Sequence, residues 1–200
     1  MRTTFIGALA VAALAPHAPA GVLNGSFESL ALAAPDRVGI GSASAWTASG
    51  GLMLLERGPN GVSNISAQDG SQFVSMGHNG ASNDTLFQDF ATAAGETLDL
   101  SFFVACIQGD AVQRITASIV DVGSNSVLGN VDADVSSRTQ GWLGFSLTFT
   151  TTGANTRVRF VHSVAADVAN VALDNVTITP TPSAAALFAV AGFVTARRRR

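Results

Sequence analysis

The sequence predicts one all-β domain, a single sandwich of the jelly-roll kind. Between Gly21 and Thr179 no stretch of useful length has helical periodicity. Short stretches of alternating apolar residues recur instead, and Gly- or Asn-containing turn signals separate them. Strands spaced by roughly 8–12 residues with such turns are typical of sandwiches and jelly rolls. A βαβ plan would need crossover helices, and the pattern supplies none.

Four segments carry the strand pattern in chain order. Residues 98–106 alternate over nine positions, and residues 115–120, 145–150 and 157–161 repeat the alternation. The turn signals lie at 58–61, 69–70, 78–80, 95–96, 109–110, 123–125 and 152–153. Residues 30–45 and 57–70 are the least regular, so we expect long surface loops there, where binding residues are often carried.

Composition and charge narrow the function classes. A chain of 200 residues has room for one domain with a proper core, and 47% hydrophobic residues argue against disorder. All 11 basic residues are Arg. The segment 21–180 holds six of them and all 14 acidic residues, so its formal net charge is −8. The formal net charge of the whole chain is −3. An acidic body without basic clusters argues against nucleic-acid binding.

The chain has a single cysteine, Cys106. One cysteine excludes a disulfide within the chain, a Cys-rich zinc site and an iron–sulfur cluster held by this chain alone. We interpret Cys106 as a buried thiol in a strand.

Residues 1–20 have the pattern of a secretory signal peptide. Arg2 supplies a short positive start, and an apolar run follows over residues 5–15. Ala18 and Ala20 fit the −3 and −1 positions, so cleavage would leave Gly21 as the first residue. A buried first helix is the alternative, and two prolines in residues 16–19 argue against it.

The C-terminal segment 180–200 predicts a membrane anchor. An apolar run of 13 residues, 184–196, precedes Arg197, Arg198, Arg199 and Arg200. A spanning helix normally needs about 20 residues. Terminal Arg side chains can extend the reach of a shorter helix, and they favour the cytoplasmic side. We therefore expect the domain outside the membrane, between a signal helix and a short C-terminal apolar helix.

The order Pro180, Thr181, Pro182, apolar helix and Arg run resembles the PEP-CTERM sorting signal of Gram-negative bacteria. The resemblance implies that an exosortase in the membrane removes the tail. The product would then reach the cell surface or the extracellular matrix. This sequence departs from the family at Thr181, where the signal has a central Glu. A plain short membrane anchor is the alternative interpretation.

Short patterns inside the domain resemble the galactose-binding-like jelly rolls of secreted bacterial proteins. They are Leu-Asn-Gly-Ser-Phe-Glu at 23–28, Ala-Gln-Asp-Gly-Ser at 67–71, Leu-Phe-Gln-Asp-Phe at 86–90 and Ala-Leu-Asp-Asn-Val at 172–176. Their order is similar to that of carbohydrate-binding modules and of choice-of-anchor domains, over residues 23–179. The resemblance implies association with a glycan or with extracellular matrix.

The same resemblance implies a structural Ca²⁺ where the first and last strands are neighbours. It points to Glu28 and Asp174, with Asn24 or Asp69 as further ligands. Ca²⁺ takes 6–8 oxygen ligands from carboxylates, carbonyls and water. The alternative is that Glu28 and Asp174 are strand-end acids bonded to backbone. The run Asp132-Ala133-Asp134 lacks the glycine and distal glutamate of an EF-hand, so we interpret it as a solvated loop.

Sugar binding usually needs an aromatic platform beside planar polar groups. With no Tyr in the chain, Trp46 and Trp142 are the aromatic candidates, and Arg114 is the polar one. Both Trp residues lie next to strand patterns, so filling the core or covering an edge is the alternative for each.

Catalysis has little support in the sequence. His78 stands in a Gly-Asn turn and His162 on a strand, and no catalytic motif surrounds either. We therefore expect a non-enzymatic, secreted or cell-surface protein that binds extracellular polysaccharide. A structural or adhesion protein without a small ligand is the alternative, and a carbohydrate-active hydrolase is a more distant one.

Overall fold

The computed structural model describes residues 21–33, 36–41, 45–59, 63–78, 83–108, 112–164 and 170–181. Within these ranges every regular element is a β-strand, and the strands form two antiparallel sheets. The six-stranded sheet has the order β1 (Arg37–Gly39), β3 (Leu52–Glu56), β4 (Phe73–His78), β11 (Val171–Pro180), β6 (Thr97–Cys106) and β9 (Leu143–Thr150). The five-stranded sheet has the order β2 (Thr47–Ser49), β5 (Asp84–Ala91), β10 (Asn155–Val164), β7 (Gln113–Asp121) and β8 (Val127–Val135).

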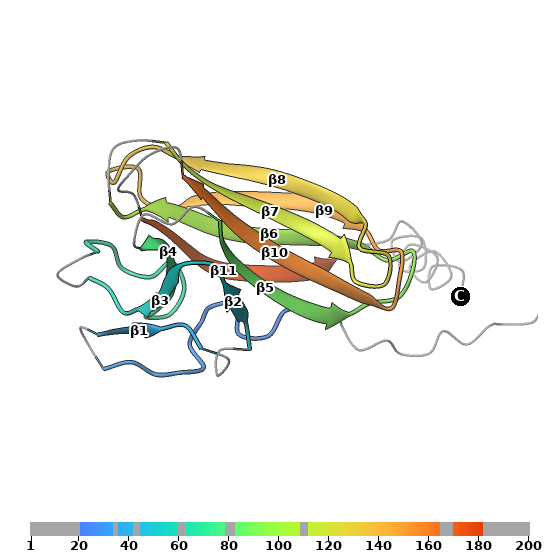
Figure 1. Ribbon diagram of the computed structural model, residues 1–200, viewed down its shortest axis with the longest axis horizontal. Helices are drawn as coiled ribbons and strands as arrows, with labels where there is room; N and C mark the ends of the chain where they lie inside the picture. Colours follow the sequence, from blue (N-terminus) through green and yellow to red (C-terminus); the bar gives the residue numbers. More distant parts are fainter. Residues whose placement is uncertain are drawn as a thin grey trace, which may run out of the picture.

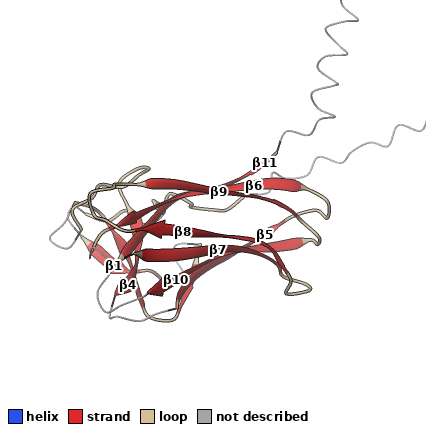
Figure 2. Cartoon of the chain, turned by 90° about the horizontal axis from the view of Figure 1, so that it is seen from above, coloured by secondary structure: helices blue, strands red, loops and turns tan. Residues whose placement is uncertain are grey.

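The two sheets lie face to face (Figures 1 and 2). Figure 2 views them from the side, with β6, β9 and β11 in one layer and β5, β7 and β10 in the other. Alternate residues of each strand point into the space between the layers, and there they form one apolar core. Phe102 of β6 meets Phe160 of β10 edge-on, with ring centroids 5.1 Å apart, so the core joins the two sheets directly.

The predicted fold class is confirmed. The four alternating segments are β6, β7, β9 and β10, and the turn signals at 95–96, 123–125 and 152–153 lie between consecutive strands. Cys106 ends β6 and is 2% exposed, as expected of a buried thiol.

Three local predictions were wrong. Residues 37–39, inside the expected loop 30–45, form the edge strand β1, which pairs with β3. Its three residues are all exposed, so no alternation marks it in the sequence. His78 ends β4 instead of lying in a turn. Asp132 and Asp134 lie on β8 instead of in a loop. Ala133 between them is buried in the core, and the two aspartates are exposed on the opposite side of the strand.

The two terminal segments fall largely outside the described residues. Ala18, Ala20, the rest of residues 1–20, Pro182 and Arg197, Arg198, Arg199 and Arg200 are among those not described. The strand β11 runs to Pro180, opposite Leu98, and the amide of Thr181 donates to the carbonyl of Thr97 over 3.0 Å. Among the described residues, no helix is long and apolar enough to cross a membrane.

Candidate functional site

The outer side of the five-stranded sheet carries mostly polar side chains, which together with Phe87 and Val161 we call the polar face. These positions alternate with residues of the core, so the pleat turns them outward, although Ser118 is only 5% exposed. Its members are Thr47 and Ser49 on β2; Thr85, Phe87 and Asp89 on β5; Arg157, Arg159 and Val161 on β10; Arg114, Thr116 and Ser118 on β7; and Asn130, Asp132 and Asp134 on β8.

Strand register arranges the polar face in rows across the sheet. Figure 1 shows β8, β7, β10 and β5 running side by side. The central row runs through Asn130, Ser118, Arg159, Phe87 and Thr47, one residue from each strand. Directly opposite residues lie about 4.5–5.5 Å apart, so one row spans a length comparable to several sugar rings.

Arg114 lies at one side of the polar face, and two aspartates of β8 hold it. Its Nε and Nη2 donate to the two carboxylate oxygens of Asp134 over 2.7 and 2.8 Å. Its Nη1 lies 3.5 Å from Asp132. The hydrogen bond from Arg114 lowers the pKa of Asp134, and Asp134 in turn raises the pKa of Arg114. The guanidinium is therefore fixed in position and about half exposed.

Arg157 forms a second pair of this kind on the other side of the central row. Its Nε and Nη2 donate to the carboxylate of Asp89 over 2.6 and 2.9 Å, which raises the pKa of Arg157. The guanidinium carbon lies 4.2 Å from the centre of the Phe87 ring, a cation–π contact. Phe87, Arg157 and Asp89 thus form one rigid group with an aromatic ring and planar polar atoms.

Arg159 differs from Arg114 and Arg157, which each pair with an aspartate. It lies between Ser118 and Phe87 in the central row, and its Nε is buried without a hydrogen-bond partner. The described residues give its guanidinium no carboxylate partner. The polar face therefore has one arginine whose charge is not balanced by a neighbouring acid.

The three residues predicted to bind a ligand lie in three different places. Arg114 is on the polar face. Trp46 is 1% exposed and packs against Phe27 and Phe160, with Nε1 donating to the carbonyl of Asn24 over 3.0 Å. This burial fits the core alternative that the sequence left open, and it leaves no face of the ring open to a ligand.

Trp142 lies on the outer side of the other sheet. It packs edge-on against Phe73 at 5.8 Å between ring centroids, and Nε1 donates to the carbonyl of Ser66 over 2.9 Å. Together with Ile65 and Ala67 it covers a small second apolar cluster. Trp142 and Arg114 therefore do not share a surface.

The residues predicted to hold calcium do gather around one turn, 68–72. Oε1 of Glu28 accepts from the amides of Ser71 and Gln72 over 2.6 and 2.7 Å, and Oε2 accepts from Oγ of Ser71 over 2.9 Å. Oδ2 of Asp174 accepts from the amides of Gln68 and Asp69 over 2.8 and 3.0 Å. The two carboxylates hold the turn through its backbone, which is the arrangement of the structural alternative.

A bulge in β11 aims Asp174 at this turn. The pairing with β6 shifts between Asp174 and Thr177, and Asn175 has a positive φ of 48°. Burial raises the pKa of Asp174 to about 7, although three backbone amides favour its charged form. Asn24 instead bonds locally, with Oδ1 accepting from the amide of Ser29 over 3.0 Å.

The carboxylate oxygens of Glu28 and Asp174 are thus occupied by N–H and O–H donors, which is a poor fit to a cation. Among the described residues, no group of three or more His, Cys, Asp or Glu side chains is placed to hold a metal. Calcium at Glu28 and Asp174 stays a prediction.

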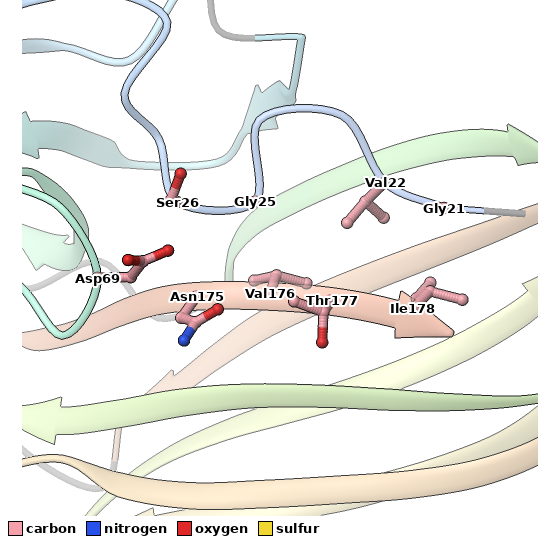
Figure 3. Close-up of a pocket in the computed structure, with 9 residues that line it drawn as sticks. All are labelled: Gly21, Val22, Gly25, Ser26, Asp69, Asn175, Val176, Thr177 and Ile178. Carbon is pink, nitrogen blue, oxygen red and sulfur yellow. The ribbon is translucent and has the colours of Figure 1, made fainter. Parts of the chain in front are cut away.

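Beside this turn lies an open cavity of about 340 Å³, shown in Figure 3. It separates the N-terminal segment from β11, and Asp69 and Asn175 supply its acidic and amide groups. Ser26 and Thr177 add hydroxyl groups, and the rest of the wall is Gly21, Val22, Gly25, Val176 and Ile178. The cavity has no arginine and no aromatic ring, so it offers a polysaccharide fewer kinds of contact than the polar face does.

A buried polar cluster lies on the outer side of the six-stranded sheet. Oγ of Ser75 contacts Glu56 and lies 2.7 Å from Nε2 of His78, whose Nδ1 lies 3.1 Å from Nδ2 of Asn170. Glu56 and Ser75 are both fully buried. The serine and histidine are thus joined, but a substrate has no direct route to the hydroxyl in this conformation.

Most of the polar face does not stand out in the sequence. Arg114 was a candidate, but Arg157, Arg159, Phe87 and Asp89 were not. The signal was present, because Arg157 and Arg159 alternate with Val158 and Phe160 and so must share the outer side of a strand. The neighbours of these arginines could not be found, because cross-strand register is a long-range property.

Comparisons with known proteins show the family of this chain and solved structures that share its fold. A family model described as "Protein of unknown function (DUF642)" matches residues 21–179. No curated protein matches the sequence. Among solved structures, the chain is similar to the Stig cyclase FisC from Fischerella sp. TAU, at 14% identity, covering 83% of this chain and 100% of that one with a TM-score of 0.59.

Two carbohydrate-binding modules are also similar. The CBM22-1 xylan-binding domain of Xyn10C from Paenibacillus barcinonensis has 17% identity, covers 85% of this chain and 100% of its own, and gives a TM-score of 0.54. TmCBM61, solved with β-1,4-galactotriose, has 16% identity. The match covers 68% of this chain and 88% of that one, with a TM-score of 0.52. At these identities the likeness shows a shared jelly-roll fold.

Proposed function

We propose a polysaccharide-binding role for this chain, which belongs to the DUF642 family of proteins of unknown function. In this proposal the protein is exported, has no enzymatic activity, and associates with extracellular polysaccharide through the polar face. One observation carries it: five adjacent strands present fixed Arg–Asp pairs, hydroxyl groups and a phenyl ring on a single solvent-facing surface.

The chemistry of the polar face suits sugars. Neighbouring sugar hydroxyls both donate and accept hydrogen bonds, and a guanidinium beside a carboxylate offers donors and acceptors a few ångströms apart. Phe87 adds an apolar surface on which the C–H side of a sugar ring can lie. Because strands carry these groups, little ordering is needed when a ligand binds. The similar folds of xylan- and galactotriose-binding modules support the same ligand class.

The carboxylates of the polar face support binding better than catalysis. Glycoside hydrolysis needs one carboxyl group that stays protonated near neutral pH. Asp134 has its pKa lowered by Arg114 instead. We therefore propose that these aspartates orient the arginines and accept hydrogen bonds from sugar hydroxyls.

Affinity electrophoresis of the purified full chain in gels containing soluble polysaccharides tests the role. We expect at least one polysaccharide to retard the protein. The variant Arg114→Gln should weaken that binding about tenfold, which corresponds to losing one charged hydrogen-bonding group. The control Arg37→Gln removes the same charge from an exposed position on β1 of the other sheet and should bind normally. Absence of binding to any polysaccharide, or full binding by Arg114→Gln, would contradict the proposal.

The proposed export fits an extracellular ligand, and its route has a test of its own. The signal pattern ending at Ala20 and the segment beginning at Pro180 support secretion followed by removal of the tail by an exosortase-like enzyme in the membrane. Because Pro180 and Thr181 pair with β6, a cut that keeps β11 intact must fall after Thr181. Mass spectrometry of the product should find Gly21 first and an end between Thr181 and Arg197. A product ending at Arg200 would contradict removal of the tail.

A further inference from the structure

The positions of the charged side chains on the polar face indicate the chemical class of the polysaccharide. Three arginines lie on this face. Arg114 is neutralised by Asp134, and Arg157 by Asp89. The side chain of Arg159 has no hydrogen bond or ion pair with the residues that the structure describes, and its Nε is buried. Asp132 also lies against Arg114, so the three arginines and three aspartates of the face balance formally, but the acids gather at Arg114 and Arg157 and leave the positive charge of Arg159 without an acidic partner of its own.

We propose that Arg159 binds a carboxylate of the polysaccharide, so that the polar face selects a chain carrying uronic acid residues over a neutral one. This inference rests on the proposed function and specifies its ligand.

Position supports this role for Arg159. It lies on β10, the middle strand of the five, in the row where every strand contributes one residue. Its neighbours across the sheet are Ser118 and Phe87, neither of which can neutralise it. A polysaccharide lying along this row would pass directly over the guanidinium. A ligand is thus the natural source of a counter-charge here.

Burial adds to the argument. The Nε of Arg159 is shielded from water and donates to no acceptor. A guanidinium that has lost part of its hydration gains more from a carboxylate than an exposed one does, because the local dielectric constant is lower. Its planar array of donors fits two carboxylate oxygens at once, whereas a neutral hydroxyl offers only one acceptor atom.

The surrounding aspartates restrict the ligand further. Asp89 lies on the strand next to Arg159, and Asp132 and Asp134 lie two strands away on the other side. With strands about 4.8 Å apart and a rise of about 3.4 Å per residue, Asp89 lies roughly 8 Å, Asp132 roughly 12 Å and Asp134 roughly 17 Å from Arg159 in the plane of the sheet. A polymer with a carboxylate on every sugar would place some of them against these aspartates. The face therefore favours isolated uronic acids on a neutral backbone.

The experiment compares glucuronoxylan with the same polymer after its carboxyl groups are reduced to hydroxymethyl groups. Isothermal titration with the full chain should show at least about tenfold tighter binding to the unreduced polymer, as expected for one charged bidentate contact. Arg159→Gln should bind both polymers equally, with the affinity of the wild type for the reduced one. The charge-matched control Arg37→Gln should keep the wild-type preference.

A second variant and further polymers distinguish failure of this inference from failure of the proposed function. Arg159→Lys keeps the charge but loses the planar donors, so it should retain only part of the preference. This variant also provides a reading if Arg159→Gln fails to fold. Equal wild-type affinity for both polymers would overturn the inference and leave the proposed function intact. Stronger binding to dextran sulfate or to polygalacturonate than to glucuronoxylan would overturn it as well. Absence of binding to every polysaccharide would overturn the proposed function itself.

Discussion

Replacing Glu28 tests whether this carboxylate holds the turn 68–72 as the structure describes. Its two oxygens accept three hydrogen bonds, two from backbone amides and one from Oγ of Ser71. Glu28→Ala would leave the amides of Ser71 and Gln72 without acceptors. Each buried donor left without a partner costs about 1–3 kcal/mol. We therefore expect a loss of about 4 kcal/mol in the free energy of unfolding.

Glu28→Gln is the matched control. Its side-chain carbonyl can still accept from both amides, so we expect a loss of only about 1 kcal/mol. Urea unfolding followed by fluorescence measures both values. With a slope of about 2 kcal/mol per molar, the midpoint should fall by about 2 M for Glu28→Ala and by about 0.5 M for Glu28→Gln. Equal shifts for the two variants, or no shift for Glu28→Ala, would refute this account of the turn.

The calcium prediction has a different signature in the same variants. A bound Ca²⁺ would raise the wild-type melting temperature, because a ligand that binds only the folded state stabilises it. Both Glu28→Ala and Glu28→Gln should then lose that rise, because the amide of Gln is a weaker ligand for a hard cation than a carboxylate. A wild-type melting temperature that excess calcium and chelator leave unchanged would remove calcium from this turn.

Other expected outcomes concern pH and the tryptophans. Burial lowers the pKa of His162, so the unfolded state binds the proton more readily than the folded state does. The free energy of unfolding should therefore fall as the pH drops below about 6.5, and His162→Gln should reduce that fall. Burial raises the pKa of Asp174 to about 7, so its contribution to the free energy of unfolding is present at low pH and is lost as the pH rises through about 7. Unfolding at pH 9 should therefore need less urea than unfolding at pH 6, and Asp174→Asn should reduce that difference. Trp46→Ala should cost about 3–5 kcal/mol of unfolding free energy, because it empties a core position. Trp142→Ala should leave polysaccharide affinity within about twofold, because the ring lies on the other sheet.

Alternation along single strands was enough to predict the fold class. The segments that became β6, β7, β9 and β10 alternate core-facing apolar residues with outward-facing ones, so the period-2 pattern is plain, although the last five residues of β7 are all buried. The strand β4 is buried at all six positions, and β1 is exposed at all three, so neither shows alternation. Such strands are defined by their place in the sheet rather than by their own residues.

The candidate site was harder to predict because it depends on register. Arg114 stood out as a charged residue in a strand pattern, but its pairing with Asp134 joins positions 20 residues apart. The pairing of Arg157 with Asp89 joins positions 68 residues apart. Glu28 and Asp174 both bond to the turn 68–72, and only the resemblance to known jelly rolls implied that they are neighbours. Their bonds to the turn 68–72 involve backbone amides, which no side-chain pattern can indicate.

The most direct test of the account is a map of where a bound polysaccharide touches the protein. NMR chemical-shift changes on adding a xylan or glucuronoxylan oligosaccharide to the isotope-labelled chain would provide it. The account predicts that the largest changes fall on β5, β10, β7 and β8, at Phe87, Arg159, Ser118 and their outward neighbours. Changes centred on Trp142, or on the cavity beside Asp69 and Asn175, would contradict the polar face as the binding surface.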